Sequence, residues 1–170
     1  MHFRSSKLVA AALLLLSLLV ACSRPTTNTK ERASSSNRAS RHSGARNLAN
    51  DEEDGGHTLK KHVGLSDREL RERLKREPEI SAASSYTDRH TAEDFIGDCL
   101  SENDGRIEQW LERDRHPNLV LDCEGDPAWP IGRSLRKGGD TAEPCSRATV
   151  VLKWKPRREY YVLTSYPDCR

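Results

Sequence analysis

The hydrophobic residues of this chain follow three patterns in succession. Residues 8–20 form a continuous apolar run of Leu, Val and Ala that only Ser17 interrupts. Residues 23–50 contain almost no large apolar side chain. From about Gly55 onward, apolar residues recur first at helical and then at strand-like spacing. This order predicts a short N-terminal signal, a tether and one folded domain.

Three helices are predicted in the first half of that domain. Ser66 has the spacing of a capping box with Glu69, Leu70 and Leu74 share a helical face, and Pro78 would end the helix. The second helix is expected to start at Thr91 and the third to follow the break at residues 103–105. Their apolar stripes are Phe95, Ile96, Cys99 and Leu100 for the second helix and Ile107, Trp110 and Leu111 for the third.

The second half of the domain has the periodicity of strands. Residues 148–154 and 159–164 are rich in β-branched and aromatic side chains, and a four-residue polar segment between them predicts a hairpin. Residues 119–121 and Ile131 are shorter apolar segments, and residues 81–87 read as a turn or a short extended piece. Helices followed by a twisted antiparallel sheet define the α+β class. Trp110, Trp129 and Trp154 are expected to pack in the core or on the sheet rather than to stack on bases.

The N-terminus predicts export and lipid attachment. The apolar run of residues 8–20 follows a basic segment and is shorter than the roughly 20 residues that span a membrane. It ends in Leu19-Val20-Ala21-Cys22, which matches a bacterial lipobox, so residues 1–22 are predicted to be a lipoprotein signal peptide with Cys22 lipidated. An ordinary secretory signal is the alternative. Ser23 favours the outer membrane, with the domain in the periplasm or outside the cell.

The tether and the charge balance limit what the protein can bind. Residues 23–54, which end in an acidic run, are predicted to be a disordered tether, and residues 55–170 form the domain. The chain has 28 Lys and Arg against 26 Asp and Glu, and two of the basic residues precede Cys22. The mature chain is therefore neutral. Because general affinity for nucleic acid comes from neutralising phosphates, RNA would have to bind in a local groove.

Four cysteines follow Cys22, namely Cys99, Cys123, Cys145 and Cys169. An even number in an exported domain predicts two disulfides, and the spacing leaves all three pairings open. A bridge from the second helix to the strand region is plausible, from Cys99 to either Cys123 or Cys169. The chain lacks a Cys-x-x-Cys pair, and His90 and His116 are assigned surface or capping roles rather than zinc ligation. We expect no metal and no cofactor.

Candidate chemistry lies at the two ends of the domain. Residues 55–64 carry His57 and His62, and Thr164 and Tyr166 share one face of the last strand. RNA cleavage by its own 2′-hydroxyl needs a base, an acid and a cation that stabilises the phosphorane, and it needs no metal. Histidine suits the base because its usual pKa is near 6.5.

These segments resemble the bacterial ribonuclease A-like domain at the C-terminus of contact-dependent growth inhibition toxins. The shared motifs occur in order along the whole domain: His57-Thr58, Lys61-His62-Val63-Gly64, Arg73-Leu74, residues 83–89, Ala92-Glu93, residues 107–111, Ile131-Gly132 and Thr164-Ser165-Tyr166-Pro167. Each motif alone is weak, but their common order makes chance agreement a poor explanation.

The resemblance implies a fold like that of pancreatic ribonuclease with a modified active site. His62 would be the base, Arg73 the stabilising cation, and Thr164 and Tyr166 would replace a second histidine. His57 would be a second acid or base, or a phosphate ligand. The cations expected to line the groove are Lys60, Lys61 and Arg89. The alternative is a structural role, in which both histidines are hydrogen-bonded residues that stabilise the start of a helix.

The resulting hypothesis is a monomeric, metal-independent endoribonuclease of single-stranded RNA, with an immunity protein as a candidate partner. The lipid anchor and the four mature cysteines differ from the toxin-borne domains of this family. Those domains usually lack disulfides and form the C-terminal part of very large secreted proteins. Two alternatives therefore stay open. One is an inactive ribonuclease-like lipoprotein that acts as an envelope binding module, and the other is a structural lipoprotein without a pocket.

Overall fold

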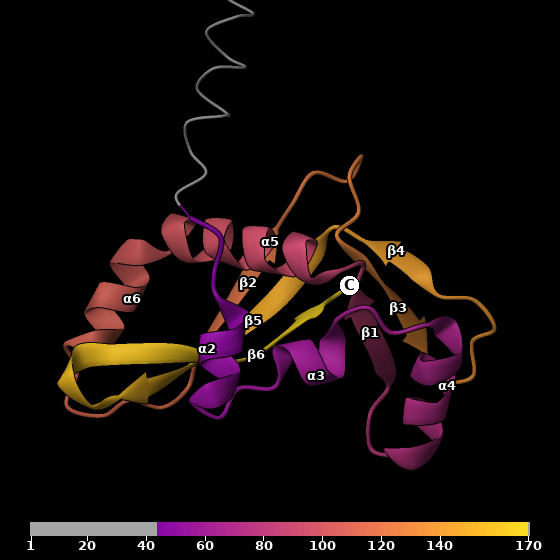
Figure 1. Ribbon diagram of the computed structural model, residues 1–170, viewed down its shortest axis with the longest axis horizontal. Helices are drawn as coiled ribbons and strands as arrows, with labels where there is room; N and C mark the ends of the chain where they lie inside the picture. Colours follow the sequence, from indigo (N-terminus) through magenta and orange to yellow (C-terminus); the bar gives the residue numbers. More distant parts are fainter. Residues whose placement is uncertain (1–43, 170) are drawn as a thin grey trace, which may run out of the picture.

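The computed structural model describes residues 44–169, so the predicted signal peptide and the lipidation site at Cys22 lie outside the described residues. The described chain forms two three-stranded antiparallel sheets with helices packed around them (Figure 1). The helices are α2 (Leu48–Glu53), α3 (Thr58–His62), α4 (Asp67–Arg76), α5 (Arg89–Glu102) and α6 (Asp104–Leu111). The strands are β1 (Ala82–Tyr86), β2 (Leu119–Glu124), β3 (Gly132–Arg136), β4 (Glu143–Cys145), β5 (Arg147–Lys155) and β6 (Glu159–Pro167).

The strand orders are β1-β3-β4 in the smaller sheet and β2-β5-β6 in the larger one. Figure 1 places α4 beside β1 and β3 at one end of the molecule and the far end of the β5–β6 hairpin at the other. Helices precede most of the strands along the chain, which confirms the predicted α+β class. Within residues 44–169, no helix is long and apolar enough to cross a membrane.

The observed N-cap agrees with the prediction from the sequence for α4 and differs from it for α5. The Ser66 side chain accepts a hydrogen bond from the Glu69 N–H, and the Glu69 carboxylate accepts one from the Ser66 N–H, which completes the predicted capping box. Helix α5 starts earlier than predicted because Asp88, and not Thr91, is its N-cap. The Asp88 carboxylate accepts a hydrogen bond of 2.8 Å from the Thr91 N–H.

The predicted hairpin is present and carries one irregularity that matters for the site. Strands β5 and β6 pair along almost their whole length, but the register shifts between Val151 and Leu152 because β6 contains an extra residue, Leu163. The carbonyl of Leu163 accepts a hydrogen bond of 3.0 Å from the His57 N–H. This bulge therefore fastens the start of α3 to the strand.

The two sheets bury clusters of very different size. The larger sheet packs against α5 and α6 around residues such as Ile96, Trp110 and Leu152. The smaller sheet and α4 share a separate cluster that consists of Leu70, Leu74, Ala83 and Leu135. Trp110 is buried and Trp154 packs against the larger cluster, whereas the side chain of Trp129 is 76% exposed, so its predicted packing role is wrong.

The folded part begins before Gly55, which corrects the predicted tether of residues 23–54. Leu48 and Asp51 in α2 are buried, and Asp51 forms an ion pair with Arg46. The Asp51 carboxylate also accepts a hydrogen bond of 2.9 Å from the Val162 N–H of β6. Lys155 forms an ion pair with Asp54. Asp51 and Asp54, two residues of the acidic run that we assigned to the tether, therefore stabilise the fold.

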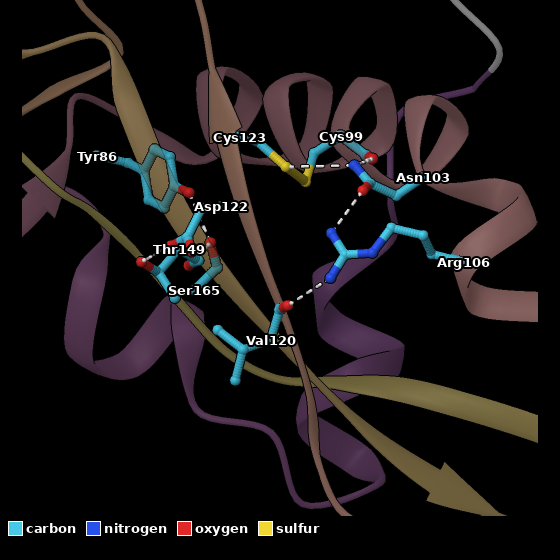
Figure 2. The surroundings of a disulfide bond; sticks show 9 residues. All are labelled: Tyr86, Cys99, Asn103, Arg106, Val120, Asp122, Cys123, Thr149 and Ser165. Atoms are coloured by element: carbon cyan, nitrogen blue, oxygen red, sulfur yellow. Dashed lines mark hydrogen bonds between the residues drawn. A yellow bond between two sulfur atoms is a disulfide. The ribbon is translucent and has the colours of Figure 1, made fainter. Parts of the chain in front are cut away.

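Both predicted disulfides form, and the structure selects one of the three pairings: Cys99–Cys123 and Cys145–Cys169. Cys99–Cys123 joins α5 to β2 (Figure 2). Beside it, the Asn103 side chain donates a hydrogen bond of 2.9 Å to the Cys99 carbonyl at the end of α5. Cys145–Cys169 instead links the edge strand of the smaller sheet to the chain just after β6.

Candidate active site

His62 is the last residue of α3, a short helix that the sequence analysis did not predict. Its side chain is 7% exposed, and its Nδ1 lies 3.3 Å from the Ser84 carbonyl oxygen and 3.4 Å from Arg73 Nη1. Because Arg73 Nη1 donates to the Lys61 carbonyl at 2.9 Å, we assign the Nδ1 proton to the bond with Ser84. In this tautomer, Nε2 is the basic nitrogen.

Several backbone contacts fix the short helix that carries His62. The buried Thr58 side chain accepts a hydrogen bond of 2.9 Å from the Ser165 N–H of β6. At the other end, the Gly64 N–H donates to the Tyr86 carbonyl of β1 at 3.0 Å, and Gly64 has a φ of 69° that favours glycine. Helix α3 is therefore tied to both sheets, and His62 lies between them.

Arg73 reaches the site from α4. Its side chain is 13% exposed, and its Nε lies 3.3 Å from a Glu77 carboxylate oxygen one helical turn later. Its bond to the Lys61 carbonyl connects α4 to α3. The guanidinium is thus held in place beside the imidazole of His62, as a preorganised cation requires.

The alternation of β6 directs Thr164 and Tyr166 to the opposite face from Ser165. Ser165 is fully buried, where its Oγ donates to the Thr149 carbonyl at 2.9 Å and lies 2.6 Å from the Tyr86 hydroxyl. The ring of Tyr166 lies 5.4 Å from the ring of His62, measured between centroids. The Thr164 Oγ1 is buried and has no hydrogen-bond partner among the described residues.

These residues line one cleft of about 650 Å³ between the two sheets. Its lining includes all of the residues for which the sequence predicted a catalytic role, namely His57, His62, Arg73, Thr164 and Tyr166. The predicted groove cations are not part of the lining: Lys60 and Lys61 are exposed on α3, and Arg89 forms an ion pair with Glu93.

The cleft also contains residues that the sequence analysis missed. Ser84 and Ser134 are directly paired across β1 and β3, and Arg136 lies two residues further along β3. Glu79 and Glu143 add acidic groups to the lining, and Cys169 adds one sulfur of a disulfide. The pairing of β1 with β3 brings these positions together. Ser84 lies within the shared motif of residues 83–89, and a period-two reading of residues 82–86 would have placed Ala82 and Ser84 on one face.

A larger hollow of about 830 Å³ lies between α2, α5 and the β5–β6 hairpin. It contains none of the predicted catalytic residues. Its cations Arg46, Lys155 and Arg158 each form an ion pair with a carboxylate, with Asp51, Asp54 and Glu112 respectively. Because the predicted catalytic residues all line the smaller cleft and none lines this hollow, we place the candidate chemistry in the smaller cleft.

The electrostatics of the cleft keep both imidazoles neutral near pH 7. Burial, together with the positive charge of Arg73, lowers the pKa of His62 to about 3. Burial and the charge of Lys61 also lower the pKa of His57. A neutral imidazole is able to accept a proton, but a pKa this low makes His62 a weak base while the cleft is empty.

His90 and His116 lie away from the cleft lining. His90 is exposed and pairs with Asp94, and His116 stacks on Trp154 at 4.7 Å between ring centroids. Within residues 44–169, no group of three His, Cys, Asp or Glu side chains is arranged to hold a metal ion.

Comparison with known proteins identifies the class to which this fold and cleft belong. The family model described as the bacterial CdiA-CT RNAse A domain matches residues 56–167. The chain therefore belongs to this family of ribonuclease A-like toxin domains, which confirms the resemblance found in the sequence. No curated protein matches the sequence.

A solved structure provides a particular relative. A chain in the crystal structure of a CdiA-CT/CdiI complex from Y. kristensenii is 29% identical, with a TM-score of 0.60. The match covers 66% of the present chain and 99% of that chain. This relative confirms the α+β ribonuclease A-like fold.

Proposed function

We propose that this protein is a metal-independent endoribonuclease that cleaves single-stranded RNA through attack by the 2′-hydroxyl. The observation that carries the proposal is that one cleft gathers His57, His62, Arg73, Thr164 and Tyr166 from α3, α4 and β6. Membership of the ribonuclease A-like family supports the same activity.

His62 is the group best placed to start the reaction. Its Nε2 accepts the proton of the 2′-hydroxyl, whose oxygen then attacks the adjacent phosphorus atom. The bond from Nδ1 to the Ser84 carbonyl holds the required tautomer. A phosphate bound beside the ring raises the pKa of His62, because a nearby negative charge stabilises the imidazolium. The substrate itself thus strengthens a base that is weak in the free protein.

The other cleft residues stabilise the phosphorane and protonate the leaving group. Arg73 donates to the phosphorane oxygens and balances their charge. The phenol of Tyr166, whose ring adjoins His62, donates a proton to the departing 5′-oxygen. Thr164 supplies a hydroxyl without a partner among the described residues. His57 binds phosphate, whose charge raises the pKa of the imidazole, or serves as a second acid or base. The products are a 2′,3′-cyclic phosphate and a 5′-hydroxyl.

The substrate and its controls provide the test. The oxidised chain from Gly44 onward is incubated in EDTA with a labelled single-stranded RNA, and in parallel with the same oligonucleotide carrying 2′-O-methyl groups. We expect cleavage of the unmodified RNA to cyclic-phosphate ends and no cleavage of the methylated strand, because the latter lacks the nucleophile. Cleavage only with added divalent metal would contradict the proposed mechanism.

A ribonuclease-like binding module is the second candidate. The observation in its favour is the burial of His62, which is 7% exposed and has a pKa of about 3. The neutral charge of the mature chain also gives little general attraction for RNA. A folded wild-type chain that binds RNA or an envelope component but does not cleave the unmodified RNA would support this candidate.

We further propose that lipidation of Cys22 anchors the domain to the cell envelope, more favourably to the outer membrane. The support is the lipobox at residues 19–22 and the 21 residues that separate Cys22 from Gly44. Expression with radiolabelled palmitate should label the wild type and not Cys22→Ala, and membrane fractionation should follow the label. Labelled Cys22→Ala would contradict the lipobox assignment.

An immunity-type protein is the proposed partner of the otherwise monomeric domain. The related Y. kristensenii chain was crystallised in a CdiA-CT/CdiI complex, which supports this expectation. Candidate inhibitors are tested by their ability to stop RNA cleavage at a one-to-one ratio, and an inhibitor that binds the cleft should protect His62 from chemical modification.

A further inference from the structure

The two disulfides of this domain differ in their relation to the cleft. Cys169 is part of the cleft lining and follows Tyr166 by three residues. Its partner Cys145 ends β4, the edge strand of the smaller sheet. The Cys145–Cys169 bond therefore links the edge of the smaller sheet to the cleft-lining residues that follow β6. Cys99–Cys123 lies outside the cleft lining and joins α5 to β2.

Among the described residues, few other contacts hold the chain segments that this disulfide connects. Strand β4 has three residues, and it pairs with β3 alone. Beyond the last residue of β6, the Asp168 N–H donates to the Arg147 carbonyl at 2.9 Å, which ties this end to the larger sheet. Ser146 alone separates β4 from β5 along the chain, so the backbone also connects the two sheets at this corner. The disulfide adds a cross-link that fixes Asp168 and Cys169, which line the cleft with Tyr166, against β4.

The cysteine residues of the two bonds also differ in exposure. Cys99 and Cys123 are 2% and 5% exposed, so both ends of their bond are buried. Cys145 is 2% exposed, but Cys169 is partly exposed and borders the cleft. Thiol–disulfide exchange requires a thiolate to reach one sulfur of the bond. We expect a thiol from solution to attack Cys169 before either buried sulfur.

We propose that Cys145–Cys169 is a thiol-sensitive latch on the catalytic cleft, closed in oxidising surroundings and opened by thiol reductants. A thiolate attacks the Cys169 sulfur and releases Cys145 as a thiolate, which takes up a proton. A second thiolate then attacks the mixed disulfide and frees Cys169. Two reductant thiols are oxidised to one disulfide, and their two electrons convert the protein disulfide to two thiols.

Opening the latch should weaken catalysis without unfolding the domain. Asp168 and Cys169 are then no longer cross-linked to β4 and can shift within the cleft lining that they share with Tyr166, while Ser165 keeps β6 bonded to α3 and β1. Misplacement of a catalytic group by about 1 Å can reduce the rate about 100-fold. Because the cytosol keeps thiols reduced and extracellular spaces do not, the latch would favour activity outside the cytosol. This inference rests on the proposed ribonuclease function.

The two disulfides provide a matched pair of variants, since each joins cysteines 24 positions apart. Loss of either bond therefore removes a similar constraint from the unfolded chain. The experiment compares Cys145→Ser/Cys169→Ser with Cys99→Ser/Cys123→Ser in the full chain, below the melting temperature of both. RNA cleavage is measured per folded molecule, and amide exchange of residues 164–169 and 143–145 is followed by mass spectrometry.

The latch variant is expected to lose about 10- to 100-fold in kcat/KM and to exchange faster at both segments, while the control variant keeps its rate and protection. A dithiol should bring the oxidised wild type to the same low rate, with Cys145 and Cys169 alkylated before the other pair. Equal rates in the two variants, or earlier reduction of Cys99–Cys123, would overturn the latch.

Failure of the proposed ribonuclease is separable from failure of the latch. If the oxidised wild type cleaves no RNA, the ribonuclease proposal falls, and the exchange measurement then decides whether the bond holds the cleft wall. Faster exchange confined to residues 164–169 and 143–145 of the latch variant supports it. Unchanged exchange there overturns it.

Discussion

The two sheets have the same number of strands and the same antiparallel pairing, but they bury very different amounts of apolar side chain. The larger sheet, β2-β5-β6, packs against α5 and α6 over an extended cluster that includes Trp110 and Ile96. The smaller sheet, β1-β3-β4, shares a cluster of four buried residues with α4. The larger half holds Thr164 and Tyr166, and α4 of the smaller half supplies Arg73. The site therefore depends both on a well-packed larger half and on a lightly packed smaller half that must keep its position.

The largest expected effect concerns His62, which lies between the two halves. His62→Ala removes the proposed base and should lower kcat/KM about 10²- to 10⁴-fold. Because the side chain is buried, the change should also cost roughly 1–3 kcal/mol of unfolding free energy. Rates are therefore compared per folded molecule. His90→Ala, an exposed histidine outside the cleft, is the control and should cleave RNA like the wild type.

Arg73 tests whether the smaller half contributes directly to the chemistry. Arg73→Ala should lower kcat about 10²- to 10³-fold, because the guanidinium stabilises charge that develops on the phosphorane. Arg73→Lys should recover only part of this loss, since one ammonium cannot keep the separate contacts to Glu77 and the Lys61 carbonyl and also face the phosphorane. Arg89→Ala is the matched control, because Arg89 pairs with Glu93 and lies outside the cleft lining. A similar loss in both arginine variants would argue against the assigned role.

The difference in packing is tested by two leucines that are both fully buried, each on the central strand of its sheet. Leu152 lies in β5 and Leu135 in β3. Leucine-to-alanine changes in cores cost about 2–5 kcal/mol, and the cost grows with the cavity that remains. We expect Leu152→Ala near the top of this range and Leu135→Ala near the bottom, measured by urea unfolding. The reverse order would show that the small cluster is the stronger one.

The smallest expected effect is the pH dependence of the unfolding free energy that the buried imidazole of His62 causes. The pKa of His62 is about 3 in the folded protein, against an ordinary value near 6.5. Below pH 6.5 the unfolded chain therefore binds a proton that the folded chain does not, so stability falls as the pH falls toward 3. Between pH 6.5 and 4.5 this contribution should reach about 2 kcal/mol.

The His62→Ala variant separates the contribution of His62 to the pH dependence of stability from that of the carboxylates. The difference in unfolding free energy between wild type and His62→Ala should shrink as the pH is lowered from 7 to 4.5, because only the wild type carries the penalty. A difference that stays constant over this range would mean that His62 is not held neutral by the fold.

Several features of the fold could be predicted because they depend on neighbouring residues. The capping box of Ser66 and Glu69 and the hairpin of β5 and β6 are local patterns, and both are present. The start of α5 was misplaced because Asp88 competed successfully with Thr91 for the cap. The folded role of Asp51 was missed because its partners, Arg46 and the Val162 N–H, are set by packing and not by spacing.

The chemical groups that this chain can offer follow from its amino-acid sequence alone. The residue types His62, Arg73, Thr164 and Tyr166, their order within the family motifs, and an even number of mature cysteines could all be read from it. Which of these groups meet depends on the tertiary structure. The pairing of β1 with β3 placed Ser84 and Ser134 in the cleft, and the bulge at Leu163 set α3 against β6. One of the three cysteine pairings cross-linked the cleft-lining Cys169 to β4. The physical reason is that contacts between distant segments depend on the register and packing of whole elements, which short-range spacing does not specify.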